Sequence, residues 1–167
     1  RGRGDVYKRQ IERWTWLSQG APSAFEAVYG RVFEEVSKLL GIEVDEKVVR
    51  KAAPVSAAFS SKETPESLRA REKVASELGI STEYLKGILK PYEELGMILD
   101  HSKALLFLIA DGAIPSNVKE GYLSRMLFRR LYRGLIKRSA EDALEGIVKL
   151  QLDYWGRQFL SLIHISE

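Results

Sequence analysis

Apolar residues recur along this chain at intervals of three and four positions, the spacing of one buried face of an α-helix. Thr64-Pro65 is a good helix start and Gly79 a good stop, and Asn117 with Glu120 is typical of a capping box. No alternating strand pattern or internal repeat is evident, so the sequence predicts an all-α, irregular bundle of about seven helices. The predicted helices are 22–40, 44–59 with a break near Pro54, 65–78, about 81–89, 91–110, 117–138 and 139–159, with a loop at 60–63.

The composition is that of an ordinary globular protein. Of 167 residues 45% are hydrophobic, enough for one domain with a real core. The chain has no cysteine, so it has no disulfide framework and no cysteine-based zinc site. His101 and His164 are its only histidines, which leaves too few ligands for a metal site. The longest apolar run is far shorter than a bilayer span, so we expect a cytoplasmic protein that does not enter a membrane.

The two ends of the chain look like translations of one sequencing adapter read on opposite strands. The segments concerned are Asp5–Gln10 and Leu160–Glu167. We therefore expect residues 1–10 and 160–167 to be artefacts that play no part in the fold. The first ten residues carry a net charge of +3, as much as the formal net charge of the whole chain, so net charge is no argument for nucleic-acid binding.

The predicted helix 117–138 has two contrasting faces on a helical wheel. A solvated amphipathic surface is one interpretation, but exposed helices usually mix both signs of charge. Between Val118 and Arg138 the only acidic residue is Glu120, and a face of one sign favours a phosphate backbone. The apolar face comprises Leu123, Leu127, Phe128, Leu131, Tyr132 and Leu135, and the basic face comprises Lys119, Arg125, Arg129, Arg130, Arg133 and Lys137, with Arg138 as an exception.

A short polar segment, D-G-A-I-P-S-N at 111–117, precedes this basic helix. Asp111 and Gly112 are expected to end the preceding helix. Asn117 has two interpretations. It is either the N-cap of the next helix, or an exposed residue that recognises a base through an amide that both donates and accepts. A helix N-terminus beside a basic stripe favours anions, so the segment indicates binding to RNA or DNA.

The same region resembles the tRNA-recognition region of archaeal-type alanyl-tRNA synthetases, which belong to class II. In that family an Asp-His pair opens a helix that leads to the run A-D-G-x-x-P-S-N-x-x-x-G-Y-x-x-R-x-x-x-R-R. Many matches at fixed spacing make this a specific signal. This chain carries Asp100-His101, Ala110-Asp111-Gly112, Pro115-Ser116-Asn117, Gly121-Tyr122, Arg125 and Arg129-Arg130.

The resemblance implies that Asn117 recognises a G·U wobble pair from the minor groove of the acceptor stem of alanine tRNA. In the family this asparagine acts with an aspartate, which by spacing is expected beyond Phe159. His101 is expected to anchor its buried helix by a hydrogen bond rather than to act in catalysis. The tRNA-binding residues implied by the resemblance are Ser116, Asn117, Lys119, Arg125, Arg129, Arg130 and Arg133.

The segment Ile11–Leu17 resembles the end of motif 3 of class II synthetases. The resemblance implies that Arg13 binds the triphosphate of ATP and that Glu12 helps to organise the site. The parent enzyme would use ATP and Mg²⁺. Motifs 1 and 2 are absent here, so this chain by itself is expected to be inactive and to bind no cofactor.

Taken with the resemblance, the sequence predicts a piece of an enzyme that attaches alanine to its tRNA. Residues 11–20 would end motif 3, and residues 21–159 would form a helical tRNA-recognition domain truncated at its C-terminus. The partners of the parent are tRNA, ATP and alanine, and the sequence indicates no oligomeric state. Two alternatives stay open, a free-standing helical nucleic-acid-binding module and a structural helical bundle with a solvated basic face.

Overall fold

The structure is a computed structural model that describes residues 11–55 and 64–159. These residues form eight helices and no strand, which confirms the predicted all-α class. The chain forms two compact units. Unit 1 holds the described residues up to Phe33 together with Ile42–Glu93, and unit 2 holds Glu34–Gly41 and the described residues from Glu94 onward.

Unit 1 is built around a small apolar cluster contributed by three helices. Alanine and valine side chains of two helices pack there on the leucines of a third, long helix. The cluster consists of Val48, Ala52, Val74, Ala75, Leu85 and Leu89. The helices that lie wholly or partly in unit 1 are α2 (Ile11–Gln19), α3 (Ala24–Tyr29), α4 (Arg31–Leu39), α5 (Glu46–Ala52), α6 (Pro65–Leu78) and α7 (Thr82–Ala110).

Local signals placed α6 correctly. Thr64 Oγ1 accepts a hydrogen bond from the backbone N–H of Ser67 at 3.2 Å, and Ser67 Oγ accepts one from the N–H of Thr64 at 3.0 Å. Pro65 occupies the first turn, where its missing N–H costs nothing. Gly79 ends the helix at φ 68°, a left-handed conformation that glycine adopts without strain. The predicted bounds 65–78 are confirmed.

Two other predicted helices are shorter than expected. The single helix predicted at 22–40 is wrong, because Gly30 adopts φ 49° and ψ −125° and divides it into α3 and α4. The helix predicted at 44–59 ends at Ala52, before Pro54, with Asp45 as its N-cap. The loop predicted at 60–63 lies outside the described residues.

The two helices predicted at 81–89 and 91–110 are one helix, α7, with Pro91 in its interior. The proline removes one backbone hydrogen bond, which usually kinks or ends a helix. Here buried side chains lie on both sides of it, with Leu85 and Leu89 before it and Leu95 after it. Burial of each such side chain contributes about 1.5–3 kcal/mol. Together these contributions offset the missing hydrogen bond and keep the helix continuous.

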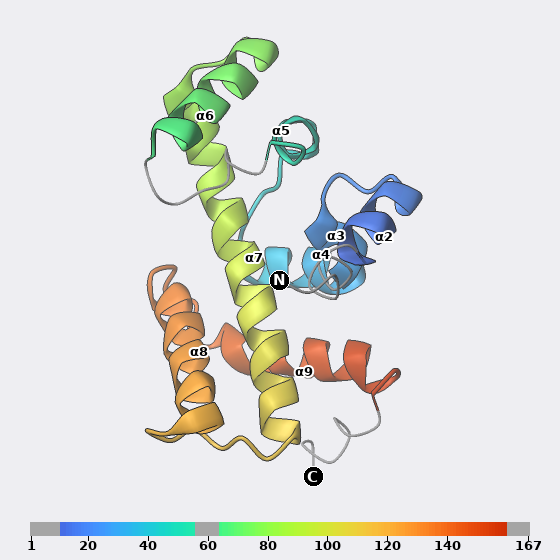
Figure 1. Cartoon of the computed structure of the whole chain (residues 1–167), viewed down its shortest axis with the longest axis vertical. Coiled ribbons are helices and arrows are strands. Elements are labelled where there is room, and N and C mark those ends of the chain that lie inside the picture. Colours follow the sequence, from blue (N-terminus) through green and yellow to red (C-terminus); the bar gives the residue numbers. More distant parts are fainter. Residues whose placement is uncertain (1–10, 56–63, 160–167) are drawn as a thin grey trace, which may run out of the picture. The chain divides into compact units, whose positions relative to one another are not determined.

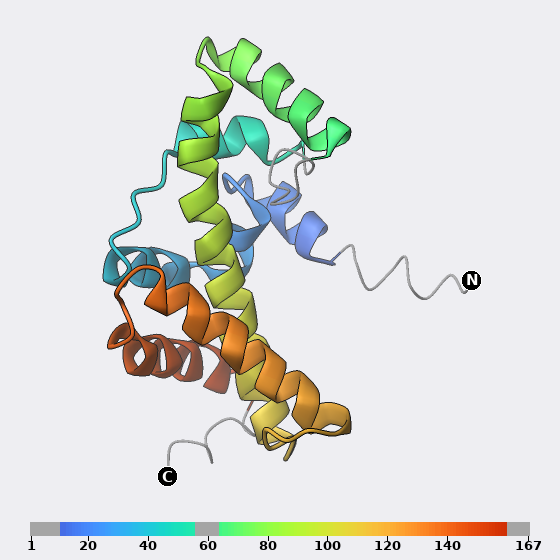
Figure 2. The same cartoon turned by 90° about the vertical axis from the view of Figure 1, so that its left-hand side faces the viewer.

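Unit 2 consists of the later part of α7, the end of α4, and two further helices, α8 (Lys119–Ile136) and α9 (Ala143–Gly156). Both views show α8 and α9 lying beside the C-terminal half of α7 (Figures 1 and 2). The centre of the unit is leucine- and isoleucine-rich. Its fully buried large side chains include Leu95, Ile98, Leu99, Leu131, Leu135 and Ile147.

The predicted starts of the last two helices are wrong. Val118, and not Asn117, is the N-cap of α8, and no side chain caps that end, so the capping box of Asn117 and Glu120 does not form. Ser139 does not cap α9. It follows the end of α8 at φ 51°, and α9 begins after Asp142.

A buried polar network joins α9 to α7. Gln151 is fully buried, and its Nε2 donates to the backbone carbonyl of Leu99 at 3.1 Å and to Ser102 Oγ at 2.9 Å. Its Oε1 accepts a hydrogen bond from Trp155 Nε1 at 2.7 Å. One glutamine therefore links polar groups of both helices and supplies an acceptor to the indole N–H of Trp155.

We predict that Gln151→Leu lowers the free energy of unfolding by about 1–3 kcal/mol, because the indole N–H of Trp155 loses its acceptor. Chemical denaturation followed by Trp fluorescence measures the change. Gln158→Leu, the same substitution at an exposed position, is the control and is expected to have little effect. A Gln151→Leu variant as stable as the unaltered chain would contradict the role assigned to the network.

Candidate nucleic-acid interface

The segment between α7 and α8 is a compact polar turn, residues 111–118. As predicted from Asp111 and Gly112, α7 ends at Ala110, and Gly112 adopts φ 82°. The backbone N–H of Ser116 donates to the carbonyl of Gly121 at 2.9 Å. Ser116 Oγ also donates to the carbonyl of Val118 at 3.2 Å and accepts from its N–H at 3.4 Å. These bonds fold the polar turn back onto the first turn of α8.

The polar turn reaches this position because residue 121 is a glycine. A Cβ added to Gly121 would lie 2.2 Å from Ser116 Oγ and 2.5 Å from the carbonyl oxygen of Ile114. Both distances are far below van der Waals contact, and the second involves backbone, which cannot rotate away. The close approach therefore requires glycine, which explains the spacing between the P-S-N triplet and Gly121-Tyr122.

The buried face of α8 overlaps only in part with the one that hydrophobicity predicted, since Leu127, Leu131 and Leu135 are buried as expected. Leu123, Phe128 and Tyr132, placed on the apolar face, are about 40% exposed. The buried face includes small residues, and Ser124 is fully buried, with its Oγ donating to the carbonyl of Ala113 at 2.8 Å. Small side chains permit close approach of neighbouring segments. The buried face of α8 is therefore turned about the helix axis from the apolar face predicted on the helical wheel. The buried residues of α8 are Gly121, Ser124, Leu127, Leu131, Gly134 and Leu135.

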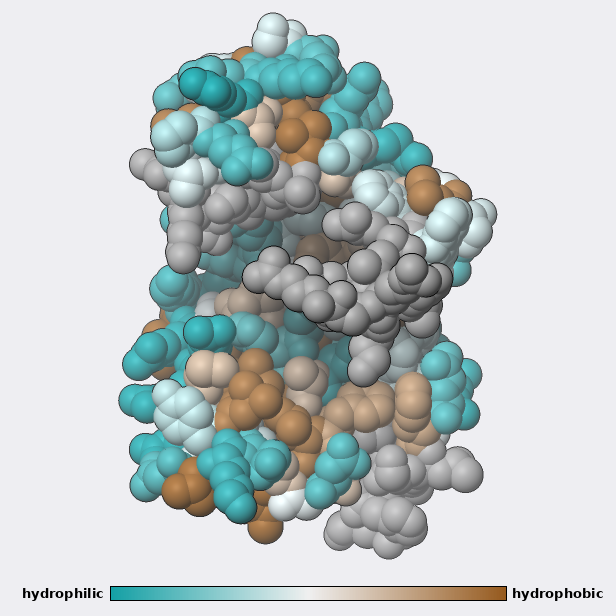
Figure 3. All heavy atoms as spheres, in the orientation of Figure 1, coloured by the Kyte–Doolittle hydropathy of each residue, from teal (hydrophilic) through white to brown (hydrophobic). Residues whose placement is uncertain are grey.

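In this orientation of α8, aromatic rings lie at the surface beside the basic residues. The rings of Phe128 and Tyr132 stack nearly parallel, with centroids 5.8 Å apart and planes inclined by 8°. Apolar surface is visible among polar residues in the region of α8 in the space-filling view (Figure 3). The exposed face of α8 is thus mixed aromatic and basic.

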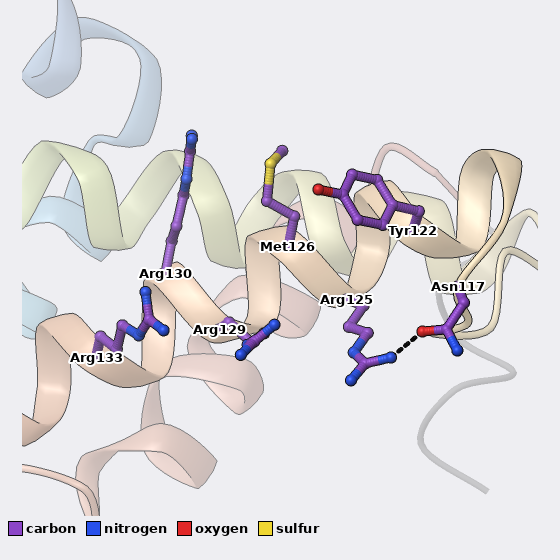
Figure 4. Close-up of a pocket in the computed structure, with 7 residues that line it drawn as sticks. All are labelled: Asn117, Tyr122, Arg125, Met126, Arg129, Arg130 and Arg133. Carbon is purple, nitrogen blue, oxygen red and sulfur yellow. Dashed lines mark hydrogen bonds between the residues drawn. The ribbon is translucent and has the colours of Figure 1, made fainter.

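The arginine face of α8, defined as Arg125, Arg129, Arg130 and Arg133, lines an open pocket of about 490 Å³ together with Asn117. All four arginines are exposed, and none forms an ion pair within the described residues. Tyr122 and Met126, which were not among the predicted site residues, also line the pocket. Tyr122, Met126 and Arg130 follow one another at intervals of four residues and therefore share one side of the helix, a spacing from which both pocket residues could have been predicted. The side chains form two rows along the helix (Figure 4). One row consists of Arg125, Arg129 and Arg133, and the other of Tyr122, Met126 and Arg130.

Asn117 lies at the end of this pocket and contacts the arginine face directly. Its Oδ1 accepts a hydrogen bond from Nη1 of Arg125, drawn as a dashed line in Figure 4. The amide therefore does not cap α8, and the N-cap interpretation is wrong. Asn117 is exposed, so its amino group is accessible from solvent.

One basic residue just beyond the end of α8 has a structural partner. Arg138, the exception on the helical wheel, forms an ion pair with Glu94 at 2.8 Å, and both side chains are largely buried. Paired charges of this kind hold helices together and are not free to bind phosphate. The surplus positive charge of α8 therefore lies on the arginine face.

His101 lies near this face but has no catalytic neighbours. Its Nδ1 is buried without a hydrogen-bond partner among the described residues, so this atom does not make the predicted anchoring bond. Burial lowers the pKa of His101 below its ordinary value of 6.5, and the positive charge of Arg130 lowers it further, while Asp100 opposes the shift. The folded protein thus favours the neutral imidazole.

The other predicted site residues are placed as follows. Ser116 has its hydroxyl engaged within the polar turn, and Lys119 is exposed but does not line the pocket. Glu12 is exposed in the first turn of α2, in unit 1. Arg13 belongs to the same helix, and its side chain is not among those that the structure describes. In residues 11–55 and 64–159 no group of three His, Cys, Asp or Glu side chains is arranged to hold a metal, and no helix has the length and apolarity to cross a bilayer.

The chain matches the family described as tRNA synthetases class II (A) over residues 6–165. It is 38% identical over 144 residues to the alanine–tRNA ligase of Methanothermobacter thermautotrophicus, a match that covers 86% of this chain and 16% of that protein. It is 41% identical over 143 residues to the alanine–tRNA ligases of Pyrococcus abyssi and Thermococcus kodakarensis, again covering 85% of this chain and 16% of each relative. The chain therefore spans about a sixth of the length of these curated relatives, and the family resemblance drawn from its motifs is confirmed.

We predict that Gly121→Ala destabilises unit 2 by about 1–3 kcal/mol, because the new methyl group collides with the polar turn. Thermal unfolding measures the loss. Gly134→Ala is the matched control in the same helix, since its Cβ would meet chiefly the flexible end of Met97. Alanine is the better helix former, so a Gly121→Ala variant that is more stable than the unaltered chain would contradict the close approach.

We also predict that the stability of the chain falls as the pH is lowered through about 6.5, in part because of His101. Its folded-state pKa is depressed, so the unfolded state binds more protons below the unfolded pKa, and the stabilisation present above that pH is lost. Melting temperatures between about pH 8 and 5 measure the effect. His101→Gln is expected to flatten the curve, and parallel curves for the two proteins would contradict the assignment.

Proposed function

Because the chain belongs to the class II tRNA synthetase (A) family, we propose that its unit 2 binds the acceptor stem of a tRNA through α8 and the polar turn. The observation that carries the proposal is the pocket that combines the arginine face with an exposed asparagine. Phosphates are bound by the arginines, which supply affinity without sequence preference. Asn117 faces a base edge, where an amide discriminates between base pairs.

The shape and charge of α8 suit the minor groove of an A-form stem. That groove is wide and shallow, so a helix lying along it could bring Asn117 to the base edges and the long arginine side chains to the flanking phosphates. One row of arginines with a four-residue period, Arg125, Arg129 and Arg133, extends along one side of α8 (Figure 4). The period corresponds to about 6 Å along a helix, close to the separation of successive phosphates.

For the whole protein we propose ATP-dependent attachment of alanine to its tRNA. The support is the similarity to relatives named alanine–tRNA ligase at up to 41% identity. Glu12 and Arg13 match the end of motif 3, and a guanidinium at residue 13 has the chemistry to bind the triphosphate of ATP, whose charge Mg²⁺ would partly neutralise. Unit 1, which contains them, is then the part nearest in sequence to the adenylation chemistry.

Two other functions predict different behaviour. A free-standing nucleic-acid-binding module would bind many stems with a steep salt dependence and no preference for one pair. A structural bundle with a solvated basic face would bind RNA weakly or not at all. Titration of the 167-residue chain with short RNA hairpins separates the three, and absent or salt-independent binding would contradict the proposal.

We predict that Arg129→Ala weakens binding to every RNA stem by a similar factor and reduces the slope of log affinity against log salt concentration by about 1. The reason is the loss of one phosphate contact from the arginine face. Fluorescence anisotropy over a series of KCl concentrations measures both quantities.

Lys149→Ala is the matched control for this prediction. It removes the same charge from α9, where Lys149 pairs with Glu145, and it lies outside the arginine face. This variant is expected to leave the salt dependence almost unchanged. Loss of binding to one stem alone on replacing Arg129 would contradict its role as a phosphate contact.

A further inference from the structure

Asn117 and Arg125 form a pair whose chemistry fixes the direction of the amide. A guanidinium has only N–H donors, and the side chain of Asn117 has one acceptor atom and one amino group. Since Arg125 donates to Asn117, the carbonyl oxygen of the amide must face the arginine. The amino group then points away from α8, as Figure 4 shows. This orientation follows from the donor inventory and not from an arbitrary choice between O and N.

Both partners are held in place independently of each other. The polar turn that carries Asn117 is fixed to α8 by the bond from the N–H of Ser116 to the carbonyl of Gly121. Arg125 projects from the regular part of α8, one turn beyond Gly121. An exposed asparagine would ordinarily rotate about its side-chain bonds. Here two anchored segments present its oxygen to one arginine, which reduces that freedom.

We propose that Arg125 is a positioning residue that makes Asn117 a hydrogen-bond donor toward the nucleic acid. This inference rests on the proposed function and specifies how its recognition residue works. The oxygen of the amide is occupied by a charged donor, and its amino group has no acceptor within the described residues. The free group therefore recognises an acceptor in the minor groove.

The proposal changes what Asn117 is expected to contact. The acceptors at the minor-groove edge are purine N3 and pyrimidine O2, and the ribose 2′-hydroxyl also accepts. The exocyclic amino group of guanine is a donor and needs an acceptor opposite it. Arg125 competes for the acceptor of Asn117, so recognition of that amino group would fall to another residue.

Arg125 also belongs to the arginine face, so its removal has two effects that an experiment must separate. Loss of its charge weakens binding to all stems alike. Loss of its bond to Asn117 frees the amide and removes discrimination between base pairs. Arg129 is the matched control, because it lines the same pocket and has the same charge but is not bonded to Asn117.

The first test needs no RNA. In ¹⁵N-labelled 167-residue chain, the side-chain NH₂ signals of Asn117 are identified by their loss in Asn117→Asp. We expect these signals to be displaced from those of free asparagine and to show restricted motion. Arg125→Met should move them to the free values, whereas Arg129→Met should not. Signals that are unchanged in Arg125→Met would overturn the proposed positioning, whatever the chain binds.

The second test measures discrimination between two RNA hairpins that differ only in one stem pair, G·U or G·C. The pyrimidine O2 is present in both pairs but is displaced in the wobble pair, so a donor held in one position on α8 meets it well in only one of the two stems. We expect the unaltered chain to prefer one stem by roughly two- to tenfold, the span of one net hydrogen bond. Asn117→Asp keeps an oxygen facing Arg125 but has no donor, so the ratio of the two dissociation constants should approach one. Arg125→Met should also abolish the preference, and Arg129→Met should retain it while weakening both complexes.

The outcomes distinguish this inference from the function on which it rests. If neither hairpin binds, the proposed RNA binding fails, and the NMR result alone decides whether Arg125 orients Asn117. Equal binding of both stems by the unaltered chain would overturn Asn117 as a recognition residue. A preference that survives in Asn117→Asp would show that no donor at residue 117 is needed, and would overturn the proposed polarity.

Discussion

The close approach of the polar turn to Gly121 is the constraint on which the candidate interface depends. Without a Cβ at residue 121, the backbone of Ser116 bonds to the first turn of α8, and Asn117 lies within reach of Arg125. A larger residue would displace the turn and separate the amide from the arginine face. The two parts of the proposed interface, Asn117 and the arginine face, therefore share one support, which is what the proposed contact to a base edge would require.

Charge in unit 2 is divided between structural and exposed roles. Arg138 is partly buried and paired with Glu94, so its charge is balanced within the fold. The arginine face has no such partner in the described residues and remains available to an anionic ligand. The same uncompensated charge acts inside the unit, because Arg130 disfavours protonation of His101. A bound phosphate backbone would reduce that repulsion.

Helix boundaries with strong local signals were predictable, and those set by packing were not. Thr64, Pro65 and Gly79 each act on backbone groups within a few residues of themselves, so α6 was placed correctly. Pro91 is a helix breaker by local rules, yet α7 continues through it because buried residues on both sides stabilise the helix. The division at Gly30 was not predicted, because a glycine within a helical pattern does not by itself show whether the helix continues or ends there.

Periodicity and motif spacing are properties of the chain, so the helical class, the family and the set of basic residues on α8 could be predicted before the fold was known. Which face of α8 is buried depends on packing and became clear only in the folded protein. Small residues such as Ser124 and Gly134 pack as closely as leucines do, and hydrophobicity does not reveal this. The structure also decided the partner of Asn117. The local rule favoured a helix cap, but folding of the polar turn onto Gly121 presented its oxygen to Arg125 instead.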